Sequence, residues 1–466
     1  MNLAERLAAL PPPRTVPGAR RALRDGLIRS RRKLVVVDDD PTGTQTVHGV
    51  RVFMDWSVQT LSGALARPEP VFYVSTNSRS LPRADAQALA HELGGNLRMA
   101  SQQTGVRVLV ASRSDSTLRG HYPSEVDALA AELPDPVDGV ILVPAFFDAG
   151  RYTIDNVHWV DTGAALVPAN ETEFARDPDF GFTNGDLREW VEEKTGGRRT
   201  ADSVVCVSID QLRGEGPAGV ATLLGQAQGG VPIVANAASD EDLEVLALGV
   251  SEAEERGKRF IYRTSASFVK VRGGIEDRPL RTRAEMGPGP GAGLVIVGSY
   301  VARTTAQVDA LVRSGRVLPI EISVPLLVVE DSHEAEVTRV CRSAAEAMAR
   351  GATVLVYTTR TRQSATDFLA AGRSVMAGLC EVAAGIGERP GFLVAKGGIT
   401  SIALARSALH CSEAEVLGQI LKGVPVWRLG PGSKWSDVPY VVFPGNVGDE
   451  SALLRVVERL SGVSAP

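Results

Sequence analysis

The segment Val35-Val36-Val37-Asp38-Asp39-Asp40-Pro41-Thr42-Gly43-Thr44 is the part of the sequence that decides the fold class. Its three valines form an uninterrupted β-branched run, which is typical of a strand buried on both faces of a parallel sheet. Three carboxylates follow at the point where that strand would end. Adjacent carboxylates repel one another unless a cation, a basic side chain or a ligand compensates their charge. Since open α/β sheets bind ligands at the carboxyl ends of their strands, we expect a ligand site here rather than a solvated acidic turn.

The length and composition are those of a large globular protein. The chain has 466 residues, of which 44% are hydrophobic and 23% charged, and its formal net charge is −5. One hydrophobic core rarely serves so long a chain, so we expect two domains, with three as the alternative. The mildly acidic charge argues against nucleic-acid binding. No apolar stretch approaches the length of about 18 residues that crosses a membrane, so a membrane span is not expected.

Cysteines and histidines indicate neither a disulfide framework nor a zinc site. The four cysteines are far apart and lack metal-ligand spacing, which predicts reduced thiols in a cytoplasmic protein. The six histidines include no HExxH motif, so a structural zinc site is not expected. Residues 1–33 are rich in arginine but contain no apolar core of the signal-peptide type. We expect a helical arm that packs on its own domain or on a partner subunit, which leaves a homo-oligomer open.

After this arm, short apolar runs alternate with amphipathic segments, which indicates βαβ units and a largely parallel sheet. Helical periodicity is clearest over residues 83–99 and 124–133, whereas residues 164–190 are irregular and predict an insertion. The strands expected in the first half of the chain are 34–37, 71–74, 106–111, 139–143, 204–208, 232–235 and 259–263. Those expected in the second half are 294–297, 353–358, 392–395 and 440–443.

A glycine- and proline-rich segment, residues 287–293, separates the two halves. It looks superficially like a nucleotide-binding fingerprint, but it precedes its strand and is interrupted by proline, whereas a dinucleotide loop follows its strand. We therefore predict a hinge-like linker at 287–293. The predicted organisation is an N-terminal arm (1–33), a first domain (34–286), the linker and a second domain (294–466). Each domain is expected to be a Rossmann-like αβα sandwich with a largely parallel sheet.

In the second domain, three expected strands are each followed by a loop of small residues and the start of a helix. Helix starts present unpaired N–H groups, and glycine lets a phosphate approach the backbone, so the three loops together predict a polyphosphate cradle. Taken singly, each loop also fits an ordinary helix cap. Neither a P-loop motif nor the protein-kinase catalytic motifs occur. The loops are Gly298-Ser299, Lys396-Gly397-Gly398-Ile399-Thr400-Ser401 and Pro444-Gly445-Asn446-Val447-Gly448.

In the first domain, arginines follow three further expected strands. Arg79, Arg113 and Arg151 stand at these positions, and Asp115 and Arg119 follow closely after the second of them. Guanidinium groups suit bidentate recognition of a carboxylate, so this set predicts an anionic substrate. The alternative is that they neutralise the neighbouring aspartates in structural ion pairs. His121 and His158 are candidate general bases, although isolated histidines more often have structural roles.

Five of these motifs occur in the same order in a known family. Asp39-Asp40-x-Thr42-Gly43, the run 115–120, Gly298-Ser299, the run 397–401 and Pro444-Gly445-Asn446-x-Gly448 resemble the motifs of the four-carbon acid-sugar kinases. The resemblance implies an ATP-dependent kinase that acts on a tetronate-type sugar acid, with the sugar in the first domain and ATP in the second. It further implies that Asp39, Asp40, Arg79, Arg113, Asp115 and Arg119 line the sugar side, and that Ser299, Gly397, Gly398, Thr400 and Gly445 contact the nucleotide.

Two positions depart from that family pattern. Ile399 stands where many members have an acidic residue, and Phe443 stands where many have a lysine. Lys396 is the candidate for the missing cation, so Lys396 and Ile399 complete the predicted nucleotide-contacting set.

Three hypotheses follow for the reaction. In the first, MgATP phosphorylates a sugar-acid hydroxyl in the cleft between the domains, Asp39 or Asp40 accepts the proton, and arginines bind the carboxylate or the phosphoryl group. In the second, the DxDxT pattern is that of a haloacid-dehalogenase-type phosphatase, with Asp38 as nucleophile, Asp40 as acid/base and Thr76 as a phosphate contact. In the third, the chain binds a nucleotide or metabolite without catalysis. The ligands of any metal stay unassigned.

Overall fold

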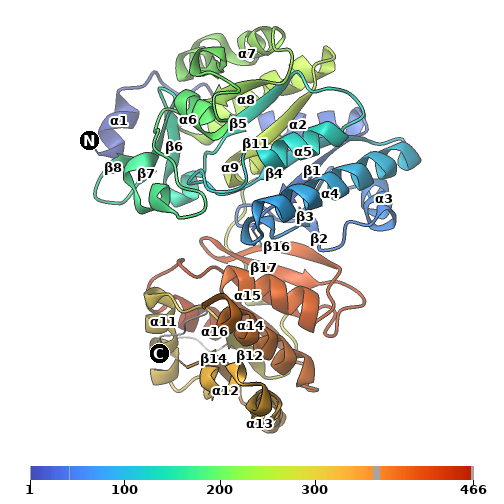
Figure 1. Cartoon of the computed structure of the whole chain (residues 1–466), viewed down its shortest axis with the longest axis vertical. Coiled ribbons are helices and arrows are strands. Elements are labelled where there is room, and N and C mark those ends of the chain that lie inside the picture. The colour runs from blue at the N-terminus through green and yellow to red at the C-terminus, as the bar shows by residue number, and fades with distance from the viewer. Residues whose placement is uncertain (1, 41, 360–367, 463–466) are drawn as a thin grey trace. The chain divides into compact units, whose positions relative to one another are not determined.

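The structure, a computed structural model, describes residues 2–40, 42–359 and 368–462 and divides into two compact units (Figure 1). Unit 1 consists of Met1–Gly43 and Asp55–Asp277, and unit 2 of Thr44–Met54 and Arg278–Pro466. This division differs from the predicted one in two places. The short segment 44–54 belongs to unit 2, and the chain returns to unit 2 at Arg278, before the predicted linker.

In the described part of unit 1, seven parallel strands form one sheet, and all seven lie within two residues of their predicted bounds. The chain passes from β1 to β3 on one side of β1 and then crosses to β4 on the other side. The carboxyl ends of β1 and β4 therefore form a topological switch point, where open α/β sheets bind ligands. The strand order is β3 (Val71–Ser75), β1 (Arg32–Asp38), β4 (Arg107–Arg113), β11 (Phe260–Thr264), β5 (Gly139–Val143), β10 (Val231–Ala235) and β9 (Val205–Val207).

Helices in two packed groups flank this sheet (Figure 1). One group is α3 (Val58–Ala66), α4 (Arg83–Thr104) and α5 (Ser124–Glu132), and the other is α2 (Ala19–Arg29), α7 (Gly216–Leu224), α8 (Asp240–Glu255) and α9 (Ala266–Arg272). The N-terminal arm, with α1 (Leu3–Ala8) and α2, packs on unit 1 itself. Arg20 on α2 contacts Asp240 at 2.6 Å and Glu244 at 2.9 Å, which attaches the arm to α8.

The insertion begins earlier than the predicted range 164–190, because a small antiparallel sheet starts at residue 151. Its strands are β6 (Arg151–Ile154), β7 (Val157–Asp161) and β8 (Leu166–Pro168), followed by two short 3-10 turns and α6 (Leu187–Lys194). Strands of three to five residues leave too few positions for an alternating pattern to be recognised. The insertion matters because one of its turns, Glu173–Arg176, carries an aromatic ring into the candidate site.

Unit 2 combines parallel and antiparallel strands. In its described part, β13 (Leu318–Ile322), β14 (Val354–Thr358), β12 (Gly293–Val297), β15 (Phe392–Lys396) and β18 (Pro439–Phe443) are parallel neighbours in that order. The chain passes from β12 to β13 and β14 on one side and then to β15 on the other, so a second switch point lies at the carboxyl ends of β12 and β15.

Three antiparallel strands extend this sheet and explain why residues 44–54 belong to unit 2. They are β17 (Val424–Leu429), β16 (Glu413–Leu421) and β2 (Val50–Phe53), and Phe53 pairs with Glu413. The indole N–H of Trp427 donates to Thr44 Oγ1 at 2.9 Å in the interior, which fixes the start of the segment. A four-residue strand whose partner is some 360 positions away carries no local signal, so it was missed.

The helices of unit 2 pack as α11 (Ala302–Arg313) with α16 (Ala452–Ser461), and as α12 (Val324–Val328), α13 (Glu330–Ala349) and α14 (Phe368–Gly385). A short helix, α10 (Arg283–Met286), precedes β12, and α15 (Gly398–Ala403) follows β15. In the ranges that the structure describes, no helix is both long and apolar enough to cross a membrane.

The predicted linker at 287–293 lies inside unit 2. Gly289 N–H donates to Gly391 O, and Gly391 N–H donates to Ala292 O, both at 2.9 Å. A Cβ on Gly291 would stand 2.9 Å from Arg389 O. The glycines therefore serve close backbone packing, and the crossing between units occurs earlier, after Asp277.

Candidate active site

Asp39 and Asp40, the two aspartates that follow β1, meet Arg79, which stands in the turn after β3. Arg79 binds Asp39 in a bidentate manner, with Nη2 to Oδ1 at 2.7 Å and Nε to Oδ2 at 3.2 Å. The same guanidinium lies 3.3 Å from Asp40 Oδ2 and 3.9 Å from Asp115 Oδ1. One cation thus compensates three carboxylates at the switch point, as the adjacent negative charges require.

These contacts keep the outer carboxylates ionised. Burial alone would raise the pKa of Asp40, but Arg79 and two hydrogen bonds from Thr42 outweigh it and hold the pKa below its ordinary value. Burial would likewise raise the pKa of Asp115, but Arg79 and Arg119 lower it far below the ordinary range. Asp40 keeps 27% of its side chain exposed, whereas Asp39 keeps 2%. Asp40 is therefore the accessible member of the pair.

Asp38 is set apart from this cluster. Burial raises its pKa to about 8 even though Arg113 Nη1 lies 3.4 Å from Oδ1, so the carboxyl is protonated at neutral pH. Gly43 covers it, since a Cβ at Gly43 would stand 2.0 Å from Asp38 Oδ2. Thr76, also buried, donates its hydroxyl to the backbone carbonyl of Asp38 at 3.0 Å. A covered, neutral carboxyl is a poor nucleophile, so the phosphatase reading is not favoured.

Two further arginines share one aromatic ring. The guanidinium carbons of Arg119 and Arg151 lie 5.2 and 5.6 Å from the centroid of Phe174. Arg119 Nε also donates to Asp115 Oδ2 at 2.7 Å, whereas Arg151 Nε is buried and has no hydrogen-bond partner among the described residues. Two adjacent cations, one with an unused donor, suit a carboxylate ligand.

Three residues near these groups were not recognised as site residues in the sequence. The Ser114 hydroxyl donates to Asp39 and lies 3.1 Å from Arg119 O, which accepts from Arg263 Nη2 at 3.1 Å. Glu125 accepts from the Ser78 hydroxyl at 2.7 Å, and burial together with Asp39 raises its pKa to about 7. Arg263 was detectable as a charged residue at the end of an apolar strand, but nothing local marks Glu125.

The two candidate histidines are buried near the cluster. His121 Nε2 lies 3.2 Å from Ser78 O, and burial lowers the pKa of the ring. His158 is held between Ser116 O at 2.7 Å and the Thr153 hydroxyl at 3.0 Å. Burial lowers its pKa to about 4, so the ring is neutral at physiological pH.

In unit 2 the three predicted loops come together at the carboxyl ends of β12, β15 and β18. A Cβ on Gly298 would stand 2.5 Å from Thr400 Oγ1, and one on Gly445 would stand 3.3 Å from Ser299 Oγ. Gly397 has φ +119°, which side chains rarely adopt. The glycines are therefore needed for the loops to meet. Thr304 joins them, since its hydroxyl lies 3.1 Å from both Ser299 Oγ and Gly445 O.

Lys396 ends β15 in the interior of this cluster. Its Nζ donates to Pro444 O at 2.6 Å and to Gly445 O at 3.2 Å, and lies 3.9 Å from the centroid of the Phe443 ring. Burial, with a smaller contribution from Arg303, lowers its pKa to about 7. Ile399 is 56% exposed, so its side chain stands outside the packed loops.

The halves of the chain match two family models. One, described as the sugar-binding N-terminal domain, matches residues 34–272, and the other, described as the nucleotide-binding C-terminal domain, matches residues 294–453. The chain belongs to the four-carbon acid-sugar kinase family. This acid-sugar kinase is a small-molecule phosphotransferase with an alcohol group as acceptor, as the resemblance of its motifs implied.

Relatives of known activity align along most of the kinase. A D-threonate kinase of Bordetella bronchiseptica is 27% identical over 438 residues, which cover 91% of this chain and 96% of that protein. A D-erythronate kinase of Heliobacterium modesticaldum is 24% identical over 411 residues, which cover 84% and 87%. The substrates D-threonate and D-erythronate in these names are those of the two relatives.

Solved structures share the fold. A Salmonella typhimurium LT2 protein has a TM-score of 0.68 at 19% identity, covering 91% of this chain and 98% of its own. A Haemophilus influenzae protein that carries a domain of unknown function has a TM-score of 0.65 at 17% identity, covering 92% and 99%. At these identities the likeness establishes the two-domain α/β architecture alone.

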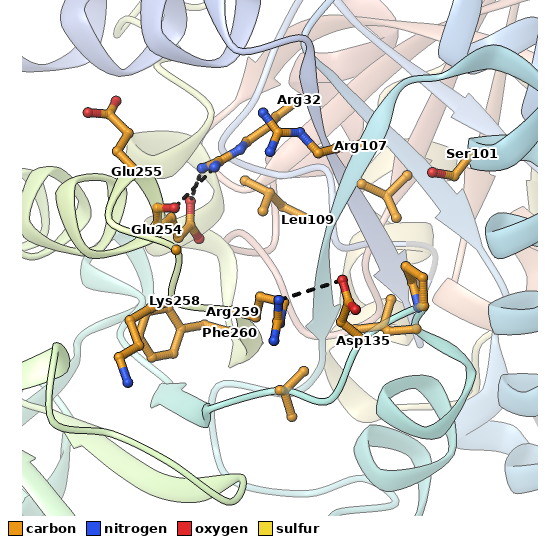
Figure 2. Close-up of a pocket in the computed structure, with 15 residues that line it drawn as sticks. Arg32, Ser101, Arg107, Leu109, Asp135, Glu254, Glu255, Lys258, Arg259 and Phe260 are labelled. Carbon is orange, nitrogen blue, oxygen red and sulfur yellow. Dashed lines mark hydrogen bonds and ion pairs between the residues drawn. The ribbon is translucent and has the colours of Figure 1, made fainter.

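A separate cavity of about 290 Å³ lies at the amino ends of the unit 1 strands (Figure 2). Several charged side chains line it, and Figure 2 shows Arg32 directed to Glu254 and Arg259 directed to Asp135. None of the predicted site residues lines this cavity. The cavity is therefore distinct from the candidate active site.

Proposed function

We propose that this kinase transfers the terminal phosphoryl group of ATP to a hydroxyl of a four-carbon sugar acid, with D-threonate and D-erythronate as the first candidates. The names of the two relatives support the substrate class. The observation that carries the proposal is the cluster of Asp39, Asp40, Asp115 and Arg79 at the switch point of the sugar-binding unit. We also propose a cytoplasmic location, since the four cysteines are free thiols.

Arg119 and Arg151 would bind the carboxylate of the sugar acid. Their guanidinium groups share the Phe174 ring, and the unpaired Nε of Arg151 offers a donor. A planar guanidinium fits a carboxylate better than the point charge of a lysine does. Arg113 is buried against Asp38, so we assign it to the support of the aspartate loop.

Asp40 would be the general base, and Asp39 would position Arg79. Asp40 is ionised and partly exposed, whereas both oxygens of Asp39 are engaged by Arg79 and Ser114. The substrate hydroxyl would give its proton to Asp40 while its oxygen forms a bond to the γ-phosphorus. The bond between that phosphorus and the β–γ bridging oxygen breaks, and ADP leaves. Arg79 would stabilise charge on the transferring group.

The nucleotide would bind to the loops of unit 2. Ser299, Gly397, Gly398, Thr400 and Gly445 lie in or beside loops whose close approach depends on missing side chains, which suits contact between a phosphate and the backbone. Lys396 and Ile399 belong to the same loops, although the ammonium is buried and the isoleucine is exposed.

Mg²⁺ would accompany the phosphates of the nucleotide. It usually keeps several waters and is held by one or two carboxylates together with substrate phosphates. Among the described residues, no group of three or more His, Cys, Asp or Glu side chains could hold a metal by itself, so we assign no protein ligand. EDTA should abolish turnover and added MgCl₂ should restore it.

The test is ADP release with a panel of four-carbon sugar acids. The kinase proposal expects ADP formation that depends on one of these acids. Phosphate release from a phosphomonoester without ATP would instead support a phosphatase. Stabilisation by ligands with no turnover of any acid in the panel would support a non-catalytic binding protein.

A further inference from the structure

The buried ammonium of Lys396 is fully occupied by its own protein. Lys396 and Phe443 are register partners on the parallel strands β15 and β18, and both side chains are completely buried. An ammonium has three N–H donors. Two of them reach Pro444 O and Gly445 O, and the Phe443 ring faces the ammonium at 3.9 Å. Direct contact between this lysine and a phosphate would require the loop to open.

Holding these two carbonyls orients the amides that follow them. In a planar trans peptide, the C=O and N–H groups point in opposite directions. Because Pro444 O and Gly445 O point inward to Lys396, the N–H groups of Gly445 and Asn446 point away from it. Neither N–H group has a hydrogen-bond partner in the described part of the chain.

Two hydrogen bonds fix the second of these peptide planes, the one between Gly445 and Asn446. Gly445 O accepts from the Thr304 hydroxyl at 3.1 Å as well as from Lys396 at 3.2 Å. Two donors from two different elements, α11 and β15, therefore occupy this one oxygen. Fixed orientation matters for anion binding, because a preorganised N–H group pays no reorganisation cost when the anion arrives.

We propose that Lys396 is a positioning residue that fixes the peptide planes after Pro444 and Gly445, so that the Gly445 and Asn446 amides bind a phosphate group of the nucleotide. This inference rests on the proposed binding of the nucleotide by unit 2. It replaces a direct lysine–phosphate contact by a lysine–carbonyl contact whose effect reaches the phosphate through two backbone amides.

The test compares Lys396→Met with a matched control. Methionine keeps the length of the side chain and removes its donors. Lys434→Met removes a similar ammonium, which donates to Ala383 O at 3.0 Å and Ile386 O at 2.6 Å at the end of α14. We expect Lys396→Met to raise the Kd for ADP about tenfold, the effect of misaligning one or two hydrogen bonds to a charged group. Lys434→Met should leave this Kd within about twofold.

A second variant tests position rather than folding. Because residues 396 and 443 are register partners, exchanging them (Lys396→Phe with Phe443→Lys) keeps the volume and returns an ammonium to the same loop. This exchange should recover most of the ADP affinity that Lys396→Met loses. The KM for the sugar acid serves as the folding readout, since that substrate is assigned to unit 1.

The outcomes distinguish a failure of the proposed function from a failure of the role assigned to Lys396. Wild-type protein that does not bind ADP would refute the proposed function. Wild-type binding with unchanged affinity in Lys396→Met would refute the role of Lys396 alone. Two results would show that Lys396 contributes only to general stability and would overturn the inference. One is an equal loss of affinity in Lys396→Met and Lys434→Met, and the other is an exchange variant that binds ADP no better than Lys396→Met.

Discussion

Arg79 and Asp39 form a bidentate pair at the end of β1, with N–O distances of 2.7 and 3.2 Å. The pair is largely buried, since 17% of the arginine side chain and 2% of the aspartate side chain are exposed. The same arginine compensates Asp40, so its removal would leave Asp39 and Asp40 without their ion-pair partner, whereas Asp115 would keep Arg119. The local fold and the proposed chemistry therefore both involve this one guanidinium.

Replacing Arg79 should destabilise the protein as well as inactivate it. Breaking a buried pair by removing one partner costs about 3–5 kcal/mol, and the 17% exposure of Arg79 places the expected loss at the lower end. Urea denaturation of Arg79→Ala measures this loss. Arg79→Lys should recover part of the stability but little turnover, because a lysine cannot form the bidentate contact. Full activity in Arg79→Lys would contradict the assigned role.

Asp40→Asn should lower kcat without weakening ADP binding. Loss of a general base typically costs about 10²–10⁴-fold in rate. The amide keeps the shape of the side chain, so the loop should persist. Asp202→Asn, at an exposed position, is the matched control and should be unchanged. Steady-state kinetics with ADP titration measure both quantities, and a rise in the Kd for ADP with normal kcat would exclude Asp40 as the base.

Phe174 should act through the arginines that it contacts. Phe174→Leu removes the ring shared by Arg119 and Arg151 but keeps an apolar side chain. We expect the KM for the sugar acid to rise about fivefold to tenfold, the value of one or two cation–π contacts, with ADP binding unaffected. Phe180→Leu, at a ring that instead contacts His121, is the control. Equal effects of the two changes would show that the insertion contributes only packing.

The raised pKa of Asp38 should make the free energy of unfolding depend on pH. Burial raises its pKa to about 8 in the folded chain, against about 4 when unfolded. Folding therefore takes up a proton between these pH values, and the free energy of unfolding falls as pH rises through this window. Asp38→Asn imitates the protonated form and should remove this slope, so the variant should exceed the wild type in stability near pH 8. Urea denaturation at several pH values tests this, and parallel curves would contradict it.

The lowered pKa of Lys396 should make the affinity for ADP depend on pH. Burial lowers its pKa to about 7, with Arg303 on α11 adding to the effect. Only the ammonium form carries the full set of donors, so the affinity for ADP should fall as pH rises from 7 to 9. Lys396→Arg stays charged over this range, and its affinity, whatever its absolute value, should be flat. A wild-type affinity that does not change with pH would argue against the role of the ammonium.

Local pattern was sufficient to predict the strands whose ends form both switch points and the residues that follow them, but not the order of the strands in either sheet. The valines of β1 and the carboxylates after them, with Arg79 and Arg113 after neighbouring strands, follow from strand periodicity and the rule for ligand sites in open sheets. The approach of Gly298, Gly397 and Gly445 loops to one another follows from the same rule applied to β12, β15 and β18.

What could not be predicted depends on contacts between distant residues. The pairing of β2 with β16 places residues 44–54 in unit 2, and neither strand indicates its partner. The glycines of 287–293 have the composition of a flexible linker, yet they pack against Gly391. Phe174 and Glu125 reach the site from a 3-10 turn and from α5, where ordinary helical composition conceals them.

The most direct test of the central claim is to detect where the phosphoryl group of ATP is transferred. ³¹P NMR of the enzyme with ATP, MgCl₂ and D-threonate or D-erythronate should show a new phosphomonoester signal that grows in step with ADP. A signal from inorganic phosphate alone, or ADP formation equal with and without every four-carbon acid, would contradict the assignment of this chain as a kinase that phosphorylates a sugar-acid hydroxyl.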